Sequence, residues 1–530
     1  MLSLFSFVGF TALVAIVSYF ATRNTDESTS DGYFLGGRSL TAGVIAGSIL
    51  LTNLSTEQIV GLNGQAYTEG LLVMAWETLA AIAIVITALF LLPRYLRGGL
   101  TTVPQFLERR FDKTTKTIVS VLFLSGYMII FLPIVLYSGA IAISTMFEVP
   151  ELLGVSRTAA IWICVWGIGI AGSIYAIFGG LKAVAVSDTA NAVGLLIGGL
   201  LIPVFGLMAV GDGSILEGID VLVAAHPEKF DSIGGPDASV PFATIFTGMM
   251  LVNLFYWGTN QAIIQRALAA RNLKEGQKGL MLAAFFKILA PIMVVLPGII
   301  AFHMFQGKLQ YADQAYPALV NAVLPPAWLG FFAAVLVGAI LSSFNSALNS
   351  SVTLFGVDIY KQYFDRDATE RTVVKKGKYF GIVLAILSMF IAPFIANAPH
   401  GLFGYLQEVN GCYSIPILTI IVMGYLHRYV TAFAAKIAII SGVLLYIFYL
   451  LIKYFVVGAE DMPHFLHVMA IIFVVNVILM LVISKIRPRT EPYVDQYTEQ
   501  VPIEPWKYVK PVGIAICAIV IFIYAFFAQY

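Results

Sequence analysis

Long apolar runs separated by short polar loops dominate the sequence. A helix of about 20 apolar residues spans the hydrocarbon core of a bilayer, and fourteen runs reach that length. The pattern therefore predicts an all-α polytopic membrane protein with helices near 4–22, 42–64, 72–94, 117–147, 158–177, 187–211, 243–262, 280–305, 328–356, 376–397, 403–425, 431–456, 463–484 and 510–529.

Two of these runs carry polar residues at membrane depth. The stretch 50–66 reads LLTNLSTEQIVGLNGQA, and the seventh run reads MMLVNLFYWGTNQAIIQRALAA. An unsatisfied polar group in hydrocarbon costs several kcal/mol, so both segments must face protein or a wet cavity. Interrupted helices in corresponding places of two halves are typical of inverted-repeat secondary transporters. We therefore predict a five-plus-five core with two broken helices, and repeats at 42–211 and 243–425. The alternative is that these residues only form hydrogen bonds between packed helices.

The remaining segments lie outside this core. We interpret 1–41 as a peripheral first helix with a cytoplasmic loop, 212–242 as an outside loop, and 426–530 as peripheral C-terminal helices. If the N-terminus is outside, nearly all lysines and arginines fall in inside loops. The outside loops then hold only Arg157, Lys229, Lys308 and Lys453. This asymmetry predicts that both termini are outside.

Composition narrows the function classes. The chain is 59% hydrophobic and 12% charged, which excludes a soluble enzyme, and its net charge of +1 implies no nucleic-acid partner. Cys164, Cys412 and Cys517 lie far apart and give neither a disulfide framework nor metal-ligand spacing. Neither a phosphate-binding loop nor a nucleophile motif is present. We predict a transporter that is not an enzyme, with the lipid bilayer as its surroundings and no obligatory protein partner.

The ninth run contains candidate cation ligands in the stretch GAILSSFNSALNSS. Ala339, Ser342 and Ser343 share one helix face because they lie at positions i, i+3 and i+4. Adjacent hydroxyls in an apolar helix suit a hard monovalent cation, which prefers oxygen ligands. Backbone carbonyls of Leu51 and Leu54, at the first broken helix, would complete the shell. The alternative is that the serines serve only in helix packing.

A second group of polar residues fits a solute site. An intramembrane lysine, Lys287, marks a functional site by default, although it lies near enough to the cytoplasmic interface to reach it. Its candidate neighbours combine neutral donors and acceptors with one carboxylate: Asn53, Gln58, Glu77, Asn253 and Gln407. This set suits a neutral polyhydroxylated solute such as a sugar, and Trp76, Tyr256 and Phe403 would supply apolar faces. No buried arginine cluster is present to clamp an anion. A zwitterion or organic acid held by Lys287 and Glu77 stays open.

Asp188 has two interpretations. It lies in AVSDTANAV, at the predicted start of the sixth helix. A carboxylate at a helix N-terminus is an ordinary cap, and the same residue is equally well placed on the path of a departing cation.

Taken together, several runs resemble the sodium:solute symporter family, and within it the bacterial sodium/galactose branch. The matching runs are DGYFLGGRSL, NLSTEQIVGLNG, FGGLKAVAVSD, NLFYWGTNQAIIQRALAA, EGQKG, FFKILAPIMVVLPG, AILSSFNSALNS and DIYK. They cover residues from about 32 to 410 in the family's order. The resemblance implies fourteen helices, alternating access, and a place in the bacterial cytoplasmic membrane.

The resemblance also implies roles for single residues. Sodium would be bound by backbone oxygens of Leu51, Leu54 and Ala339 and by the hydroxyls of Ser342 and Ser343, with Asp188 on its exit path. Sugar would be bound by Asn53, Gln58, Glu77, Asn253, Lys287 and Gln407. Tyr256 would be the inner gate, and Leu62, Trp76 and Phe403 the outer gate. Ala80, Trp76 and Leu62 depart from the branch's serine, tyrosine and methionine. These departures put the choice of sugar in doubt more than the sodium site.

Overall fold

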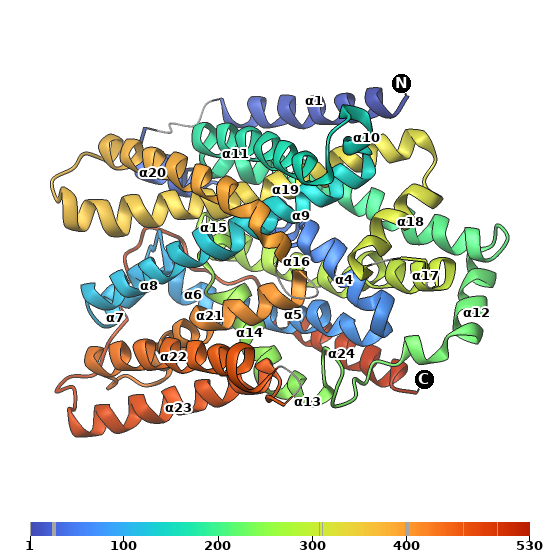
Figure 1. The fold of residues 1–530 in the computed structure, drawn as a ribbon. Helices are drawn as coiled ribbons and strands as arrows, with labels where there is room; N and C mark the ends of the chain where they lie inside the picture. Colours follow the sequence, from blue (N-terminus) through green and yellow to red (C-terminus); the bar gives the residue numbers. More distant parts are fainter. Residues whose placement is uncertain are drawn as a thin grey trace.

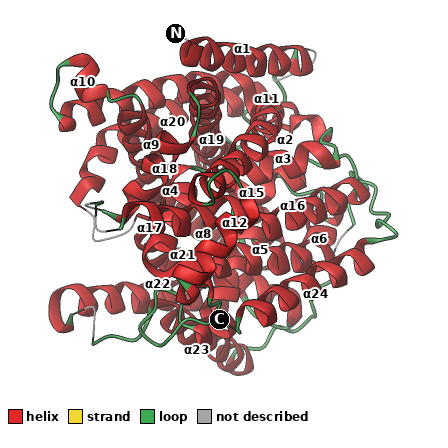
Figure 2. Cartoon of the chain, turned by 90° about the vertical axis from the view of Figure 1, so that its right-hand side faces the viewer, coloured by secondary structure: helices red, strands yellow, loops and turns green. Residues whose placement is uncertain are grey.

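The structure, a computed structural model, describes residues 2–23, 28–306, 308–309, 311–397, 402–458, 461–495 and 497–529. These described residues form helices and connecting loops without a strand, and one isolated bridge pairs Leu40 with Ala270. Most of the helices run along a common direction, with loops gathered at the two ends of the bundle (Figures 1 and 2). α1 (Leu2–Thr22) begins and α24 (Val509–Phe527) ends toward the same end of the bundle.

The helices follow the apolar runs closely. Those of the first half are α2 (Ser30–Leu35), α3 (Ala42–Asn53), α4 (Thr56–Glu69), α5 (Ala75–Ile86), α6 (Leu92–Arg97), α7 (Val103–Arg110), α8 (Lys113–Gly126), α9 (Leu132–Met146), α10 (Val149–Leu153), α11 (Arg157–Val210) and α12 (Ile215–Ala225). Those that follow are α13 (Phe242–Thr244), α14 (Met250–Gly258), α15 (Gln261–Leu268), α16 (Leu273–Val294), α17 (Leu296–Phe305), α18 (Ala315–Val323), α19 (Pro326–Thr353), α20 (Glu370–Ile391), α21 (Leu402–Leu426), α22 (Ala432–Ile452) and α23 (Phe465–Ile486).

The number of membrane crossings is lower by length and composition than the sequence predicts. Among the described residues, 11 helices are long and apolar enough to cross a membrane, or up to 12 if the bent pair 242–268 is one crossing. Phe5–Ala21 and Ala42–Asn53 are shorter apolar helices. Every predicted run falls on one of these elements, so the protein is an all-helical multi-pass membrane protein. The count of fourteen crossings and the division into inverted repeats remain predictions.

The fifth and sixth predicted helices follow each other directly across a kink, without the expected loop around Lys182. Both belong to α11, which bends at Gly180, where φ is 58°. A side chain is strained at this positive φ, and a Cβ there would lie 3.1 Å from Tyr33. Glycine therefore allows the sharp change of direction between the two helical segments of α11.

The outer helices present apolar side chains to their surroundings. Phe5 on α1, Phe448 on α22 and Phe522 on α24 are each more than half exposed. In contrast, many polar side chains are buried inside the bundle, on α3, α4, α5, α15 and α19. This inside-out distribution is expected of a protein whose solvent is lipid and whose polar groups are satisfied internally.

Candidate functional site

The first predicted broken helix is interrupted between α3 and α4. Leu54 and Ser55 leave the helix, and the Ser55 amide donates to the Asn53 carbonyl (2.8 Å) instead of reaching back to Leu51. The next backbone bond runs from Ile59 to the Ser55 carbonyl (2.8 Å), one residue beyond Leu54. The break thus removes the Leu51 and Leu54 carbonyls from the regular pattern, as a backbone ligand site requires.

The second predicted broken helix is interrupted between α14 and α15, which meet at an angle of 47°. The Asn260 side chain caps α15 by accepting from the Ala262 amide (3.0 Å), and Tyr127 donates to the same oxygen (2.6 Å). Since cap and hydroxyl satisfy the groups freed at the break, the interruption is a built feature of the helix. Both predictions of a broken helix are confirmed.

A cavity adjoins the two breaks and collects most of the predicted solute residues. Its volume is about 40 Å³. Its lining includes all but one of the predicted solute ligands (Asn53, Gln58, Asn253, Lys287 and Gln407) and three predicted gate residues (Trp76, Tyr256 and Phe403). The remaining two members of these groups are not in the lining: Glu77 lies directly behind it, and Leu62 is fully buried elsewhere in α4. One face of this cavity is therefore polar and another aromatic.

The polar face is an ordered network around Lys287. The ammonium donates to the Glu77 carboxylate and to the side-chain Oδ1 of Asn53, and Gln58 donates to the other Glu77 oxygen. Lys287 is only 1% exposed, which rules out the alternative that it extends to the membrane interface. A buried ion pair persists only when further hydrogen bonds satisfy it, as Asn53 and Gln58 do here. The network leaves this face with no net charge.

The aromatic face closes the cavity. Trp76 and Phe403 meet edge to face, with ring centroids 5.2 Å apart, and both are buried. Gly61 makes this contact possible, because a Cβ at that position would lie 2.6 Å from the Phe403 Cβ. The Tyr256 hydroxyl lies close to the Asn53 side chain, and both line the cavity, while Asn253 lies one turn earlier on α14. The predicted gates therefore contact each other or the predicted ligands, although their roles stay predictions.

The predicted cation ligands lie on the other side of the first break. Ser343 donates to the Thr52 carbonyl (2.8 Å), and the Ser342 hydroxyl lies 3.5 Å from that of Thr52. Thr52 also contacts Ser346 (3.0 Å). α19 thus presents its serines to the stretch between Leu51 and Leu54. The sequence prediction did not include Thr52, whose hydroxyl and carbonyl hold the two segments together.

Asp188 corrects one sequence interpretation. It is inside α11, well past the bend at Gly180, so it does not cap a helix N-terminus. Its carboxylate accepts from Ser48 (2.7 Å), lies close to the Ser342 hydroxyl, and is 4.0 Å from Arg266. The carboxylate therefore adjoins the predicted cation ligand Ser342, and its role on an exit path remains a prediction.

Arg266 corrects a second interpretation, because the sequence places it among loop residues. The structure places it in α15, fully buried, where its guanidinium donates to Ser48 (3.2 Å) and to Ser346. The guanidinium and Asp188 share Ser48, so the ion pair is built into the packing of α3, α11, α15 and α19. In a sequence, an arginine next to an apolar run is typical of a loop at the membrane surface. The sequence therefore does not predict the buried ion pair of Arg266 with Asp188.

Glu57 is a third residue that sequence reasoning did not select. It lines the cavity, is 4% exposed, and its Oε2 has no hydrogen-bond partner within the structure. A buried carboxylate oxygen without a partner needs a donor from solvent or from a ligand. Glu57 directly precedes Gln58 in the NLSTEQ stretch, but the sequence does not indicate that both side chains face the same cavity.

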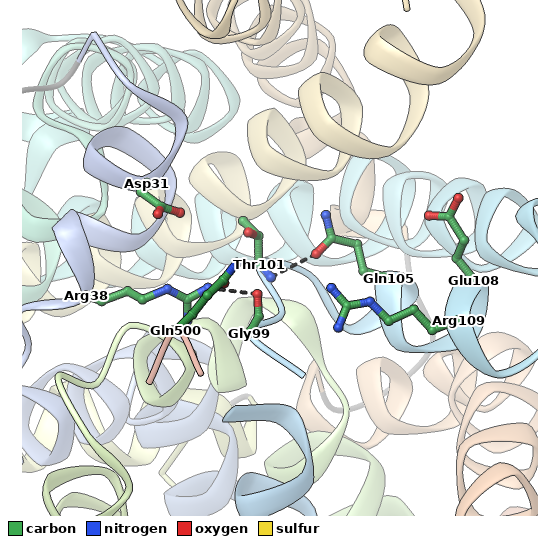
Figure 3. A pocket seen from close by; sticks show the side chains of 8 residues that line it. All are labelled: Asp31, Arg38, Gly99, Thr101, Gln105, Glu108, Arg109 and Gln500. Atoms are coloured by element: carbon green, nitrogen blue, oxygen red, sulfur yellow. Dashed lines mark hydrogen bonds between the residues drawn. The ribbon is translucent and has the colours of Figure 1, made fainter. Parts of the chain in front are cut away.

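A separate polar recess lies among the loops near α7 (Figure 3). It is lined by Asp31, Arg38, Gly99, Thr101, Gln105, Glu108, Arg109 and Gln500. Arg38 donates to the Gly99 carbonyl (2.9 Å) and to the Leu268 carbonyl (3.2 Å), which ties the end of α15 to the loop before α7. Burial lowers the pKa of Arg38, and the nearby Asp31 carboxylate opposes that shift. Because Arg38 is hydrogen-bonded to backbone carbonyls of this loop and of α15, we interpret the recess as a structural feature.

Comparisons with known proteins agree with this geometry. The profile of the Sodium:solute symporter family matches residues 33–442. The chain is 50% identical to an uncharacterized symporter, YidK, of Escherichia coli (100% of this chain, 91% of the relative). It is 33% identical to a sodium/glucose cotransporter of Vibrio parahaemolyticus (82% of this chain, 83% of the relative).

A solved structure shares the fold. It is that of a Na⁺-coupled sialic acid symporter in a substrate-bound outward-open state, with a TM-score of 0.77 and 20% identity over 93% of this chain and 99% of that one. At this identity the likeness concerns the fold alone. The extent of the family match, together with the identity to the Vibrio relative, decides the assignment. The chain belongs to the sodium:solute symporter family.

Proposed function

We propose that this protein couples the entry of sodium to that of a neutral polyhydroxylated solute of the hexose class. The observation that carries the proposal is the neutral polar face of the cavity. Lys287 and Glu77 bind each other, so neither is free to act as a counter-ion for a charged solute. The surrounding amides of Asn53, Gln58 and Gln407 both donate and accept hydrogen bonds, as sugar hydroxyls do.

The proposal favours a sugar over a carboxylate for two further reasons. Glu57 adds to the lining a carboxyl group whose Oε2 has no partner among the described residues and can accept a hydrogen bond from a solute hydroxyl. The aromatic pair of Trp76 and Phe403 offers an apolar surface to a sugar ring. The sodium/glucose relative of Vibrio parahaemolyticus supports the same solute class. Another small solute on the same fold, such as an amino acid or organic acid, is the alternative.

Sodium would bind at the neighbouring site. Its ligands would be the backbone oxygens of Leu51, Leu54 and Ala339 and the hydroxyls of Ser342 and Ser343. Ser343 already reaches across from α19 to the Thr52 carbonyl, so it is close to the break from which two of these carbonyls come. A membrane potential contributes about 2.3 kcal/mol per charge per 100 mV to sodium entry, in addition to the concentration gradient.

Binding at both sites would act on the same break. Asn53 ends α3 beside Lys287, and Thr52 precedes it beside Ser343. Sodium would fix the break and so order Asn53 for the solute, which gives alternating access a physical basis. We assign this movement to inverted repeats at 42–211 and 243–425, in a protein of the bacterial cytoplasmic membrane with both termini outside.

A titration of purified protein tests this proposal. Tryptophan fluorescence is followed while galactose or glucose is added with sodium, and with choline in its place. We expect saturable binding that tightens with sodium. Sodium binding without any response to either sugar contradicts the choice of solute. Counterflow with a panel of labelled amino acids and organic acids then identifies the alternative.

A further inference from the structure

A pair of histidines lies apart from the solute cavity, on the face where α12 meets α17. His226 ends α12, and His303 lies near the end of α17. Nε2 of His226 is 3.2 Å from Nδ1 of His303. Gln306 follows His303 on the same face of the helix, and its side-chain amide is 3.2 Å from the same His226 nitrogen. Three potential ligand groups thus converge on one point, from two elements far apart in sequence.

The hydrogen bonds among these groups depend on the tautomer of each imidazole. With the amide as placed, Gln306 donates to the lone pair of His226 Nε2, which also faces His303 Nδ1. If the Gln306 amide turns over, its oxygen joins the two imidazole nitrogens as a third electron-pair donor in the cluster. Gln306 is exposed and free to make this turn.

The distance between the imidazole nitrogens fits a metal ion. A zinc ion has bonds of about 2.0–2.1 Å to histidine nitrogen. Two nitrogens 3.2 Å apart would then subtend an angle of about 100–106° at the ion, near the tetrahedral value. Water entering beside exposed Gln306 would provide the fourth ligand.

The other nitrogen of His226 has a partner that supports ligation. Nδ1 lies 3.8 Å from the Glu228 carboxylate, which favours the tautomer with its proton on Nδ1. Nε2 then presents its lone pair toward His303. A carboxylate behind a metal-binding histidine is a recurring arrangement that orients the ring and raises its basicity. The adjacent Lys229 ammonium donates to the Tyr67 and Thr68 carbonyls and lies over the Phe302 ring, which separately contacts the His226 ring.

We propose that His226, His303 and Gln306 form a binding site for a divalent late transition metal, with zinc as the probe. Among the described residues no group of three or more His, Cys, Asp or Glu is arranged for a metal, so this site rests on two imidazoles and an amide. Such a ligand set selects zinc, copper or nickel over magnesium or calcium, because imidazole is a borderline-soft donor.

The site has a mechanical consequence. Tyr67 of α4 donates to the Phe305 carbonyl of α17 (3.3 Å), and its ring packs against Phe302. A metal that joins α12 to α17 would therefore brace α4, the helix whose first turn carries Gln58. An effect of zinc on transport rests on the proposed function, whereas metal binding does not.

Calorimetry on the purified full-length protein tests the site. We expect one saturable zinc site, and cobalt in its place to give the visible absorption of tetrahedral coordination. His226→Ala and His303→Ala should each weaken zinc binding at least tenfold, and Gln306→Ala less. His467→Ala is the matched control, because that residue bonds Thr247 and no second imidazole nitrogen, and it should bind zinc as the parent does.

Two results would overturn the proposal. One is the absence of a saturable zinc isotherm in the parent protein. The other is an isotherm that both histidine variants retain unchanged. Circular dichroism establishes that each variant is folded, and the exposed Gln306→Ala variant provides a reading even if a histidine variant fails to fold. Because no sugar or sodium is added, the result is independent of the proposed symport.

Discussion

The two polar regions beside the α3–α4 break differ in whether their polar groups are charged or neutral. On one side, Lys287 and Glu77 form a buried ion pair that amides complete. On the other, serine and threonine hydroxyls meet a backbone carbonyl, and the nearest charges, Asp188 and Arg266, bind each other at the border. The first region would accept a neutral solute beside a paired lysine and glutamate, and the second would offer neutral oxygens to a cation. Under the proposed function, one break would serve two ligands of different chemistry.

The ion pair should give the largest effect when one partner is removed. Lys287→Ala leaves Glu77 buried and uncompensated, which costs about 3–5 kcal/mol of stability. We expect a lower unfolding temperature and loss of solute binding, and Lys287→Ala combined with Glu77→Ala should restore part of the stability. Lys274→Ala, at an exposed position on the same helix, is the control. An unchanged unfolding temperature in Lys287→Ala would contradict the role of the pair.

A substitution in the hydroxyl region should change sodium binding. Ser343→Ala removes the group that joins α19 to the Thr52 carbonyl. We expect sodium affinity to fall at least tenfold, or about 1.4 kcal/mol, and sodium to lose its effect on solute binding. Ser351→Ala is a matched control, since this buried serine bonds only the Ala347 carbonyl of its own helix. If sodium dependence survives in Ser343→Ala, the cation site lies elsewhere.

Substitution of Glu57 should change solute affinity but not sodium affinity. Glu57→Gln keeps the shape of the side chain but replaces a charged acceptor with a weaker neutral one. Solute affinity should fall about fivefold, which corresponds to about 1 kcal/mol for a hydrogen bond of this kind. Sodium affinity, measured on the same sample, should stay within twofold. Equal changes in both affinities would mean that the two regions are not separable at this residue.

We expect the smallest effect when the contact between Trp76 and Phe403 is removed. Trp76→Ala removes an edge-to-face contact with Phe403, and such contacts contribute about 0.5–1.5 kcal/mol. Release of labelled solute, followed after dilution, should accelerate by about two- to tenfold while sodium binding is retained. Trp76→Phe should release solute at close to the parent rate. A slower release from Trp76→Ala would argue against a gate.

Much of this arrangement is predictable from sequence because membrane burial makes polar residues conspicuous. Asn53 and Gln58 in one apolar run, and Asn253 in another, predicted the two breaks that the structure contains. The ligands grouped from this pattern line one cavity or lie directly behind it. The spacing of Ser342 and Ser343 likewise predicted a shared face, which the structure directs at the first break.

What escaped prediction depends on three-dimensional packing. A cap was one of two interpretations of Asp188, because hydropathy sets the start of its helix several residues too late, whereas the helical segment begins directly after the kink at Gly180. Arg266 was predicted to lie in a loop, because its position next to an apolar run does not indicate burial. Only the folded structure shows that it is buried and bonded to Ser48 and Ser346. Thr52 and Glu57 stood within the selected stretch, but the direction in which each side chain points is fixed by neighbouring helices.

The coupling between the two regions is the central claim, and calorimetry tests it most directly. Galactose or glucose is titrated at several sodium concentrations, and sodium is titrated at several concentrations of the same sugar. If both ligands act on the α3–α4 break, each must raise the affinity of the other by the same factor, because coupling free energy is reciprocal. We predict equal enhancement factors in the parent protein and none in Ser343→Ala. Sugar and sodium affinities that are independent of each other would contradict the account.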